Sequence, residues 1–311
     1  MTANISSTSS TSMATTTIYL NASELAVVVG ENPYQNIRDL IIKLWSKYFM
    51  TDYSKMLDNI QKVNKVKIIQ ETEYECLNRL VAKYKPEIKE KVAECLKSTD
   101  TKNLKTNQTE ILKDLKKTNI SVEDKEILEK TLKSLSNKSF GTRKEKDAIT
   151  QYEEMTKKKV QRIGKYFTTV IDISNISNRD SFPKFVWGIG GKIDGLTEDG
   201  EIIEVKNRVR DFFYEVRDYE NVQIQTYLKL LNIKNGYLVE SLVKTKGMQP
   251  EINIINVEFD EKYWKDVVIP RVEKFIEFFY HIMADNEYKM RLLLQKEVAM
   301  EREIKRELFR K

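Results

Sequence analysis

Histidine and cysteine are scarce in this chain of 311 residues, and long apolar runs are missing. The single histidine, His281, excludes zinc sites with two histidine ligands and leaves one residue at most for a Ser-His-Asp triad or a histidine general base. The two cysteines are too few for a disulfide-stabilised scaffold and indicate a reducing, intracellular compartment. Because no run approaches about 20 apolar residues and no secretory leader is recognisable, we expect no membrane association.

Charge is more informative in its distribution than in its total. Basic residues outnumber acidic ones by 53 to 47, and residues 51–160, with 25 basic and 19 acidic side chains, account for the whole excess. Such an excess is compatible with an anionic partner and equally with a solvated helical surface. An enzyme with this composition would depend on carboxylates, lysine and an oxygen-ligated cation.

Composition and apolar spacing divide the chain into five parts and predict a mixed α/β fold. Serine and threonine fill eleven of the first 17 positions, which predicts a disordered tail. Residues 51–139 have the apolar spacing of helices and no strand signal, with a loop expected at 98–109. The expected parts are a tail (1–17), N-terminal helices (18–50), a helical insertion (51–139), a strand-rich core (140–260) and C-terminal helices (261–311).

The segment GGKIDGLTEDGEIIEVKNR (190–208) predicts a hairpin whose three-residue loop ends at Gly200, in the left-handed conformation. Asp194 then lies opposite Glu204, with Cβ atoms about 5 Å apart, and Lys206 shares their face. Carboxylates about 4 Å apart repel by roughly 4 kcal/mol at an effective dielectric of about 20. Either the pair is splayed into solvent at an exposed hairpin edge, or a divalent cation lies between the two groups.

Two helices add polar side chains to this pattern. Glu145 lies on the apolar face of a helix expected to start after Gly141, where a charge is costly unless it is paired or bound to a metal. A first-turn carboxylate that favours a helix N-terminus explains it equally well. Gln223 and Tyr227 share one face of a later helix at i and i+4, as a structural pair or as part of a polar site.

Four segments in this order resemble the PD-(D/E)XK nucleases, and specifically the lambda-exonuclease/YqaJ branch of viral recombinases. The segments are NASELAVVVGENPY (21–34), GTRKEKDAITQYEEMT (141–156), GKIDG…EIIEVK (191–206) and VQIQTY (222–227). The resemblance implies a restriction-endonuclease-like α/β/α core with a central mixed sheet, in which residues 140–260 form the catalytic core. The helical insertion and the C-terminal helices would be additions to that core.

The resemblance also implies a division of roles among the site residues. Lys206 would orient or activate the attacking water, and Gln223 would hold Lys206 or that water. The implied ligands of Mg²⁺, or of Mn²⁺ as a substitute, are Glu145, Asp194, Glu204 and the carbonyl group of Val205. The implied phosphate- and DNA-binding residues are Ser23, Gln225 and Tyr227.

The activity implied by the resemblance is 5′-to-3′ exonuclease digestion of duplex DNA in viral recombination, replication or repair. A single-strand annealing protein would be a partner, and a homotrimer the assembly, inside the host cytoplasm or nucleus. Related exonucleases carry an arginine before the Ala-Ser-Glu motif, whereas residues 1–20 hold no Lys or Arg, so Arg38, Lys43 or the insertion would have to replace it. The alternatives are an endonuclease on structured or foreign DNA, a catalytically silent nucleic-acid-binding module, and a purely structural protein.

Overall fold

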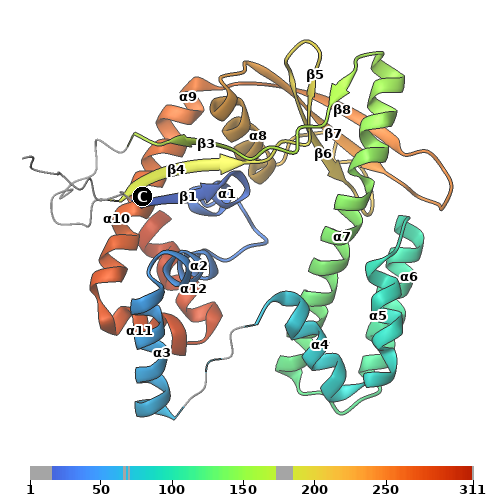
Figure 1. The fold of residues 1–311 in the computed structure, drawn as a ribbon. Coiled ribbons are helices and arrows are strands. Elements are labelled where there is room, and N and C mark those ends of the chain that lie inside the picture. Colours follow the sequence, from blue (N-terminus) through green and yellow to red (C-terminus); the bar gives the residue numbers. More distant parts are fainter. Residues whose placement is uncertain (1–15, 66–67, 69–70, 173–184, 310–311) are drawn as a thin grey trace, which may run out of the picture.

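The computed structural model describes residues 16–65, 68, 71–172 and 185–309, and its mixed α/β class is the one predicted (Figure 1). Residues 1–15 of the expected tail lie outside the described residues. Thr17, the last residue of that expected tail, instead opens the strand β1 (Thr17–Asn21). No helix in the described part of the chain is long and apolar enough to cross a membrane.

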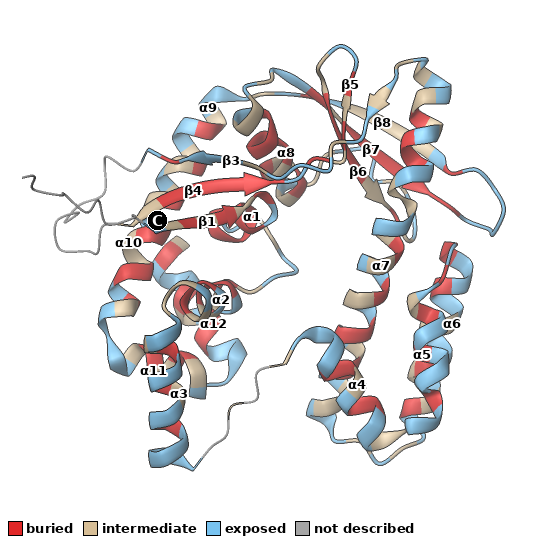
Figure 2. Cartoon of the chain, viewed as in Figure 1, coloured by how far each residue is buried: buried red, intermediate tan, exposed pale blue. Residues whose placement is uncertain are grey.

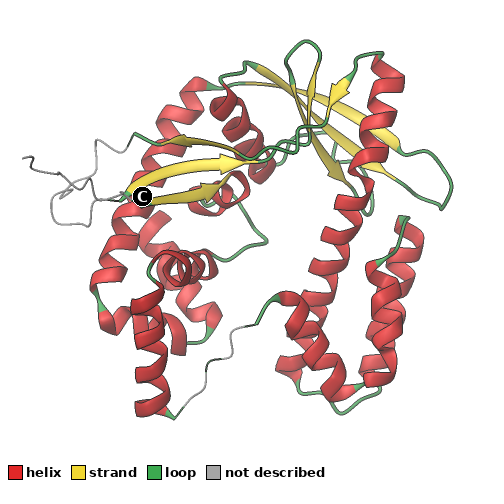
Figure 3. Ribbon diagram, in the orientation of Figure 1, coloured by secondary structure: helices red, strands yellow, loops and turns green. Residues whose placement is uncertain are grey.

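The strands form two mixed sheets rather than one continuous sheet (Figure 3). The three-stranded sheet has the order β1-β4-β3, with β1 parallel and β3 antiparallel to β4. The five-stranded sheet has the order β2-β5-β6-β7-β8, and only its β6–β7 pair is parallel. The remaining strands are β2 (Val160–Gln161), β3 (Phe167–Val170), β4 (Val186–Gly191), β5 (Gly195–Thr197), β6 (Ile202–Asn207), β7 (Asn235–Leu242) and β8 (Glu251–Glu258).

Helices cover both faces of the five-stranded sheet and give it an α/β/α layering. On one face, Ile202 packs with Ile224 of α8 (Asp218–Leu231). On the other face, Ile203 packs with Ala148 of α7 (Val122–Thr156). The alternation of side chains along β6 therefore directs neighbouring residues to different helices, as expected for a strand covered on both sides.

The prediction that a helix starts after Gly141 was wrong, because α7 continues through this residue for 35 residues in total. Glycine costs about 1 kcal/mol in a helix interior, which the packing of both ends of α7 outweighs. Its N-terminal part buries Leu132 and Phe140 in the insertion, and its C-terminal part buries Ile149 against the five-stranded sheet. The boundary expected between insertion and core thus falls inside one helix.

The helical insertion has its own hydrophobic core, and its outer faces are exposed (Figure 2). Residues 98–109, expected to be a loop, contribute instead to α6, where Asp100 caps the N-terminus and Leu104 is buried. α3 packs with the N-terminal and C-terminal helices, in the cluster that we call the main core, rather than with the insertion. The helices of this segment before α7 are α3 (Met50–Asn64), α4 (Glu73–Tyr84), η1 (Pro86–Ile88), α5 (Lys89–Leu96) and α6 (Thr101–Lys116).

The first and last helices of the described chain pack together in the main core. Val28 and Ile41 share this core with Phe275 and Ile304, so the C-terminal helices belong to the same unit as the N-terminal ones. These helices are α1 (Ala22–Val29), α2 (Ile37–Tyr48), α9 (Glu261–Tyr263), the π-helical η3 (Trp264–Val268), α10 (Ile269–Ala284), α11 (Asn286–Leu294) and α12 (Glu297–Phe309).

Candidate active site

The β5–β6 hairpin has the predicted register. Gly195 pairs with Ile203, which places the preceding Asp194 level with Glu204. Asp194 Oδ2 accepts a hydrogen bond of 2.8 Å from the backbone N–H of Val205. Gly200 ends the connecting loop with a φ of 81°, the left-handed conformation that glycine adopts readily. The hairpin therefore brings two carboxylates of the predicted site to one place.

A chain of hydrogen bonds runs from this hairpin to α8. Lys206 Nζ donates to Glu204 Oε1 and to Gln223 Oε1, both at 2.8 Å. Gln223 Nε2 in turn donates to the hydroxyl oxygen of Tyr227 at 3.0 Å. Glu204 is only 3% exposed, and Tyr227 is buried as well. Two strand residues and two helix residues, paired at i and i+4 as predicted, thus form one connected polar group.

Burial makes the carboxyl groups of this site harder to ionise. It raises the pKa of Glu204 to about 7, and the charge of Asp194 acts in the same direction. Burial also raises the pKa of Asp194 to about 6, although the Val205 amide counteracts the shift. For Lys206, burial lowers the pKa but the Glu204 carboxylate more than offsets it, so the pKa lies above its usual range. The lysine is therefore a charged ammonium group inside the site.

Glu145 joins this group from the interior of α7, which excludes its interpretation as a first-turn carboxylate. It lines a cavity of about 180 Å³ together with Asp194. Burial raises the pKa of Glu145, and the negative charge of Glu204 raises it further. Glu145 and Glu204 are thus close enough for like-charge repulsion to matter.

Two cations of this cavity, Arg162 and Lys192, were not predicted. Both side chains are exposed, and neither makes an ion pair or side-chain hydrogen bond with the rest of the described chain. Lys192 could have been found, because it lies two residues before Asp194. Arg162 follows α7 in a segment whose local pattern carries no comparable signal. Both can bind a phosphate group beside the carboxylates.

The donor set matches a hard divalent cation in chemistry and charge. Glu204 Oε2 is buried and has no hydrogen-bond partner, a costly arrangement for a carboxylate oxygen unless something charged or polar binds it. Carboxylate oxygens are the ligands that Mg²⁺ prefers. No three His, Cys, Asp or Glu side chains of the described residues are grouped closely enough to form a metal site as they stand. The participation of Glu145 as a third ligand therefore remains a prediction.

The residues predicted to bind phosphate or DNA lie in different environments. Ser23 is exposed in the first turn of α1, where the Asn21 N–H donates to Glu24 Oε2 at 2.8 Å. Gln225, by contrast, is 2% exposed, and its amide joins the Glu258 carbonyl oxygen and the Asp260 N–H, both at 2.8 Å. Gln225 is therefore bound to other parts of the fold, and its assignment to DNA binding stays a prediction.

Tyr227 was also predicted to contact DNA, but its buried hydroxyl group is occupied by Gln223. Tyr227 therefore positions the Gln223 side chain. Lys43 and Arg38, which were expected to replace the missing N-terminal arginine, are also bound to other groups of the protein. Lys43 forms an ion pair with Glu24, and Arg38 Nε donates to the Leu292 carbonyl oxygen at 3.0 Å.

Comparisons with known proteins give distant structural similarities only. No protein-family model and no curated protein matches the chain. An alkaline exonuclease (LHK-Exo) from Laribacter hongkongensis is 18% identical over 64% of this chain and 89% of its own, with a TM-score of 0.35. A phage-related exonuclease from Haemophilus somnus 129PT is 10% identical over 86% of this chain and 96% of its own, with a TM-score of 0.38. At such TM-scores, any functional assignment depends on the site itself.

Proposed function

We propose that this protein is a metal-dependent deoxyribonuclease that hydrolyses phosphodiester bonds. The observation that carries the proposal is the hydrogen-bonded chain from Glu204 through Lys206 to Gln223, beside a second buried carboxylate at Asp194. A purely structural hairpin has no need for two carboxylates with raised pKa values, one of which has an unpartnered oxygen. Perturbed groups of this kind concentrate at functional sites.

In this proposal each side chain has a separate task. Lys206 donates a hydrogen bond to the attacking water and neutralises charge on the phosphate, while Glu204 and Gln223 restrict its ammonium group to one direction. Arg162 and Lys192 bind the non-bridging oxygens of the phosphate. The proposed ligands of Mg²⁺ or Mn²⁺ are Glu145, Asp194, Glu204 and the Val205 carbonyl group. Such an ion, when bound, polarises phosphoryl oxygens and acidifies water.

The finer proposal is a 5′-to-3′ exonuclease on duplex DNA, acting in viral recombination, replication or repair. Ser23 supports it, because its exposed hydroxyl and the free N–H groups at the start of α1 can receive a terminal phosphate. Ala22, the preceding residue, packs in the same cluster as Tyr227, so this helix start lies beside the catalytic group. An annealing protein as partner and a homotrimer as assembly belong to the same proposal.

The proposal is tested by incubating purified protein with Mg²⁺ on 5′-phosphorylated linear duplex and on covalently closed plasmid. We expect degradation of the linear duplex alone, and no cleavage by Asp194→Asn. Lys206→Ala should bind DNA but cleave it orders of magnitude more slowly, because the ammonium group acts in the reaction. Linearisation of the closed plasmid would favour an endonuclease, and cleavage by Asp194→Asn at the wild-type rate would refute the site.

A further inference from the structure

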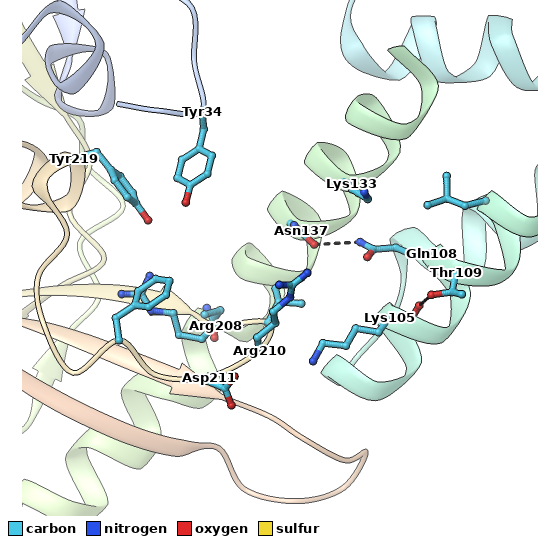
Figure 4. A pocket seen from close by; sticks show the side chains of 14 residues that line it. Tyr34, Lys105, Gln108, Thr109, Lys133, Asn137, Arg208, Arg210, Asp211 and Tyr219 are labelled. Carbon is cyan, nitrogen blue, oxygen red and sulfur yellow. Dashed lines mark hydrogen bonds between the residues drawn. The ribbon is translucent and has the colours of Figure 1, made fainter. Parts of the chain in front are cut away.

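A cavity of about 900 Å³ lies between the helical insertion and the segment that follows β6, the strand that carries Glu204 and Lys206 (Figure 4). α6 and α7 form one wall through Gln108 and Asn137, and residues 207–213 form the other. Tyr34, from the loop between α1 and α2, projects into the same space. A volume of this size falls within the range of about 300–1,000 Å³ that encloses compact ligands.

Three cations in this cleft are available to a ligand. The side chains of Lys105, Lys133 and Arg210 are exposed, and none makes an ion pair or side-chain hydrogen bond with another described residue. Asp211 is the single acidic residue of the lining. The cleft therefore carries an excess of unpaired positive charge, which favours an anion with several charges along its length.

Arg208 at the base of the cleft is a different case. Its guanidinium group is buried, and it bonds Glu220 at 2.5 and 2.9 Å and Glu240 at 2.7 Å. It also lies over one face of the Phe213 ring, 4.4 Å from the centroid, while Arg217 lies 4.1 Å from the same centroid. The Arg208 guanidinium group and the Phe213 ring are therefore committed to the protein and form the floor of the cleft rather than ligand contacts.

Tyr34 is the aromatic side chain left for a ligand. It is 69% exposed, and its ring meets the Tyr219 ring edge-on at a centroid distance of 5.4 Å. Tyr219 is itself fixed, because its hydroxyl group donates to Glu220 at 3.1 Å. An exposed ring supported in this way offers a surface on which a nucleic-acid base can stack.

One hydrogen bond holds the α6–α7 wall together and a second ties it to the opposite wall, so the cleft is part of the folded structure. Gln108 Nε2 of α6 donates to Ser136 Oγ of α7 at 2.8 Å. Asn207, directly after Lys206, donates from Nδ2 to the Gly141 carbonyl oxygen at 2.9 Å. Its Oδ1 is buried and has no hydrogen-bond partner, a further polar group at the junction of the cleft and the catalytic strand.

We propose that this cleft binds a single strand of nucleic acid and leads it to the catalytic group at Lys206. Lys105, Lys133 and Arg210 contact its phosphates, and an unpaired base stacks on Tyr34. A single strand is favoured over a duplex because stacking on Tyr34 needs an exposed base face, and over an acidic peptide because a peptide lacks the base. The inference that the strand leads toward Lys206 rests on the proposed nuclease function, but binding of the strand in the cleft requires no catalysis.

Binding can be measured without cleavage, by fluorescence anisotropy of a labelled oligothymidylate of about 8 nucleotides in EDTA. The variant Lys105→Gln/Lys133→Gln/Arg210→Gln should reduce the slope of log affinity against log salt by about 2, since each single-strand phosphate contact contributes about 0.7. The matched control changes three exposed lysines outside the cleft by the same charge: Lys55→Gln/Lys62→Gln/Lys274→Gln. It should leave the slope nearly unchanged.

Stacking is tested separately with Tyr34→Ala, which should weaken oligothymidylate binding about tenfold, whereas Tyr34→Phe should not. An abasic strand of the same length should bind both variants equally, because it has phosphates but no base. Unchanged oligothymidylate binding by Tyr34→Ala or by the triple variant would overturn the proposal. Equal competition by polyglutamate would also overturn it.

These results are distinguishable from failure of the nuclease proposal. If the wild-type protein cleaves DNA while the cleft variants bind single strands normally, the cleft inference is wrong and the nuclease assignment stands. If the cleft variants lose single-strand binding while the wild-type protein cleaves nothing, the cleft is a binding site on a catalytically silent module.

Discussion

Gln223 on α8 accepts a hydrogen bond from Lys206 on β6, and this 2.8 Å contact joins the helix to the end of that strand. The lysine is charged and its other partner, Glu204, lies on the same strand. Gln223 therefore fixes the direction of the ammonium group from a second element. Its role in the proposed reaction is that of a positioning residue, because it acts on the phosphate through Lys206.

Gln223→Ala should consequently reduce kcat about 10- to 100-fold with little change in KM, because a hydrogen bond to a charged group contributes about 1.5–3 kcal/mol. Steady-state cleavage of linear duplex gives kcat and KM, and single-turnover cleavage isolates the chemical step. Gln225→Ala, two residues along the same helix, is the control. It should lower the free energy of unfolding by about 1–3 kcal/mol, since it leaves the Asp260 N–H without its partner, but leave kcat of the folded protein unchanged. Equal losses of kcat in the two variants would contradict the positioning role.

The absence of a side chain at Gly191 is a condition for the same hydrogen-bonded chain. A Cβ atom on Gly191 would lie 2.5 Å from Cε1 of Tyr227, so the tyrosine ring would have to move and take its hydroxyl group away from Gln223. Gly191→Ala should cost about 1–3 kcal/mol of stability through overpacking and should slow cleavage.

Urea unfolding and cleavage assays measure both effects, with Gly164→Ala as the control because a Cβ there meets no atom within 4 Å. Combining Gly191→Ala with Tyr227→Ala should recover stability relative to the sum of the single changes, because the clash has been removed. Additive losses would show that Gly191 and Tyr227 do not interact.

The course of α7 predicts an unusual gain from a glycine substitution. Gly141 lies in the interior of this helix, has no positive φ, and a Cβ there would meet nothing within 4 Å. Gly141→Ala should therefore raise the free energy of unfolding by up to about 1 kcal/mol, as measured by urea unfolding. A helix that began after Gly141, as the sequence alone predicted, would show no such gain.

The reliable predictions from sequence were those set by local chemistry. The offset between Asp194 and Glu204 depends on a three-residue loop and a period of two along each strand, and both are properties of a few neighbouring residues. The pair of Gln223 and Tyr227 follows in the same way from helical spacing.

Local patterns were less informative where distant packing decided the outcome. The composition around Gly141 predicts a helix boundary, but packing against the insertion and against the five-stranded sheet holds the two ends of α7. Gln225 lies two residues after Gln223, on a different face of α8, and its partner is the end of β8, a strand 33 residues away in the chain. Arg162 is brought beside the carboxylates only by the fold, and no local pattern around it predicts this position.

The last prediction separates two carboxylates that the resemblance assigns to one metal. Glu145 has no ion-pair partner among the described residues and is repelled by Glu204, whereas Glu204 is the counter-charge of the partly buried Lys206. In EDTA, Glu145→Gln should leave the free energy of unfolding equal to or above that of the wild type, because it removes a repulsion. Glu204→Gln should lower it by about 1–3 kcal/mol, because the ammonium group of Lys206 loses its charged acceptor. Both variants should lose Mg²⁺-dependent cleavage, so urea unfolding distinguishes the two substitutions whereas activity assays do not.

Equal destabilisation by the two substitutions would mean that Glu145 is held by a favourable contact. Cleavage by Glu145→Gln at the wild-type rate would remove Glu145 from the proposed metal ligands.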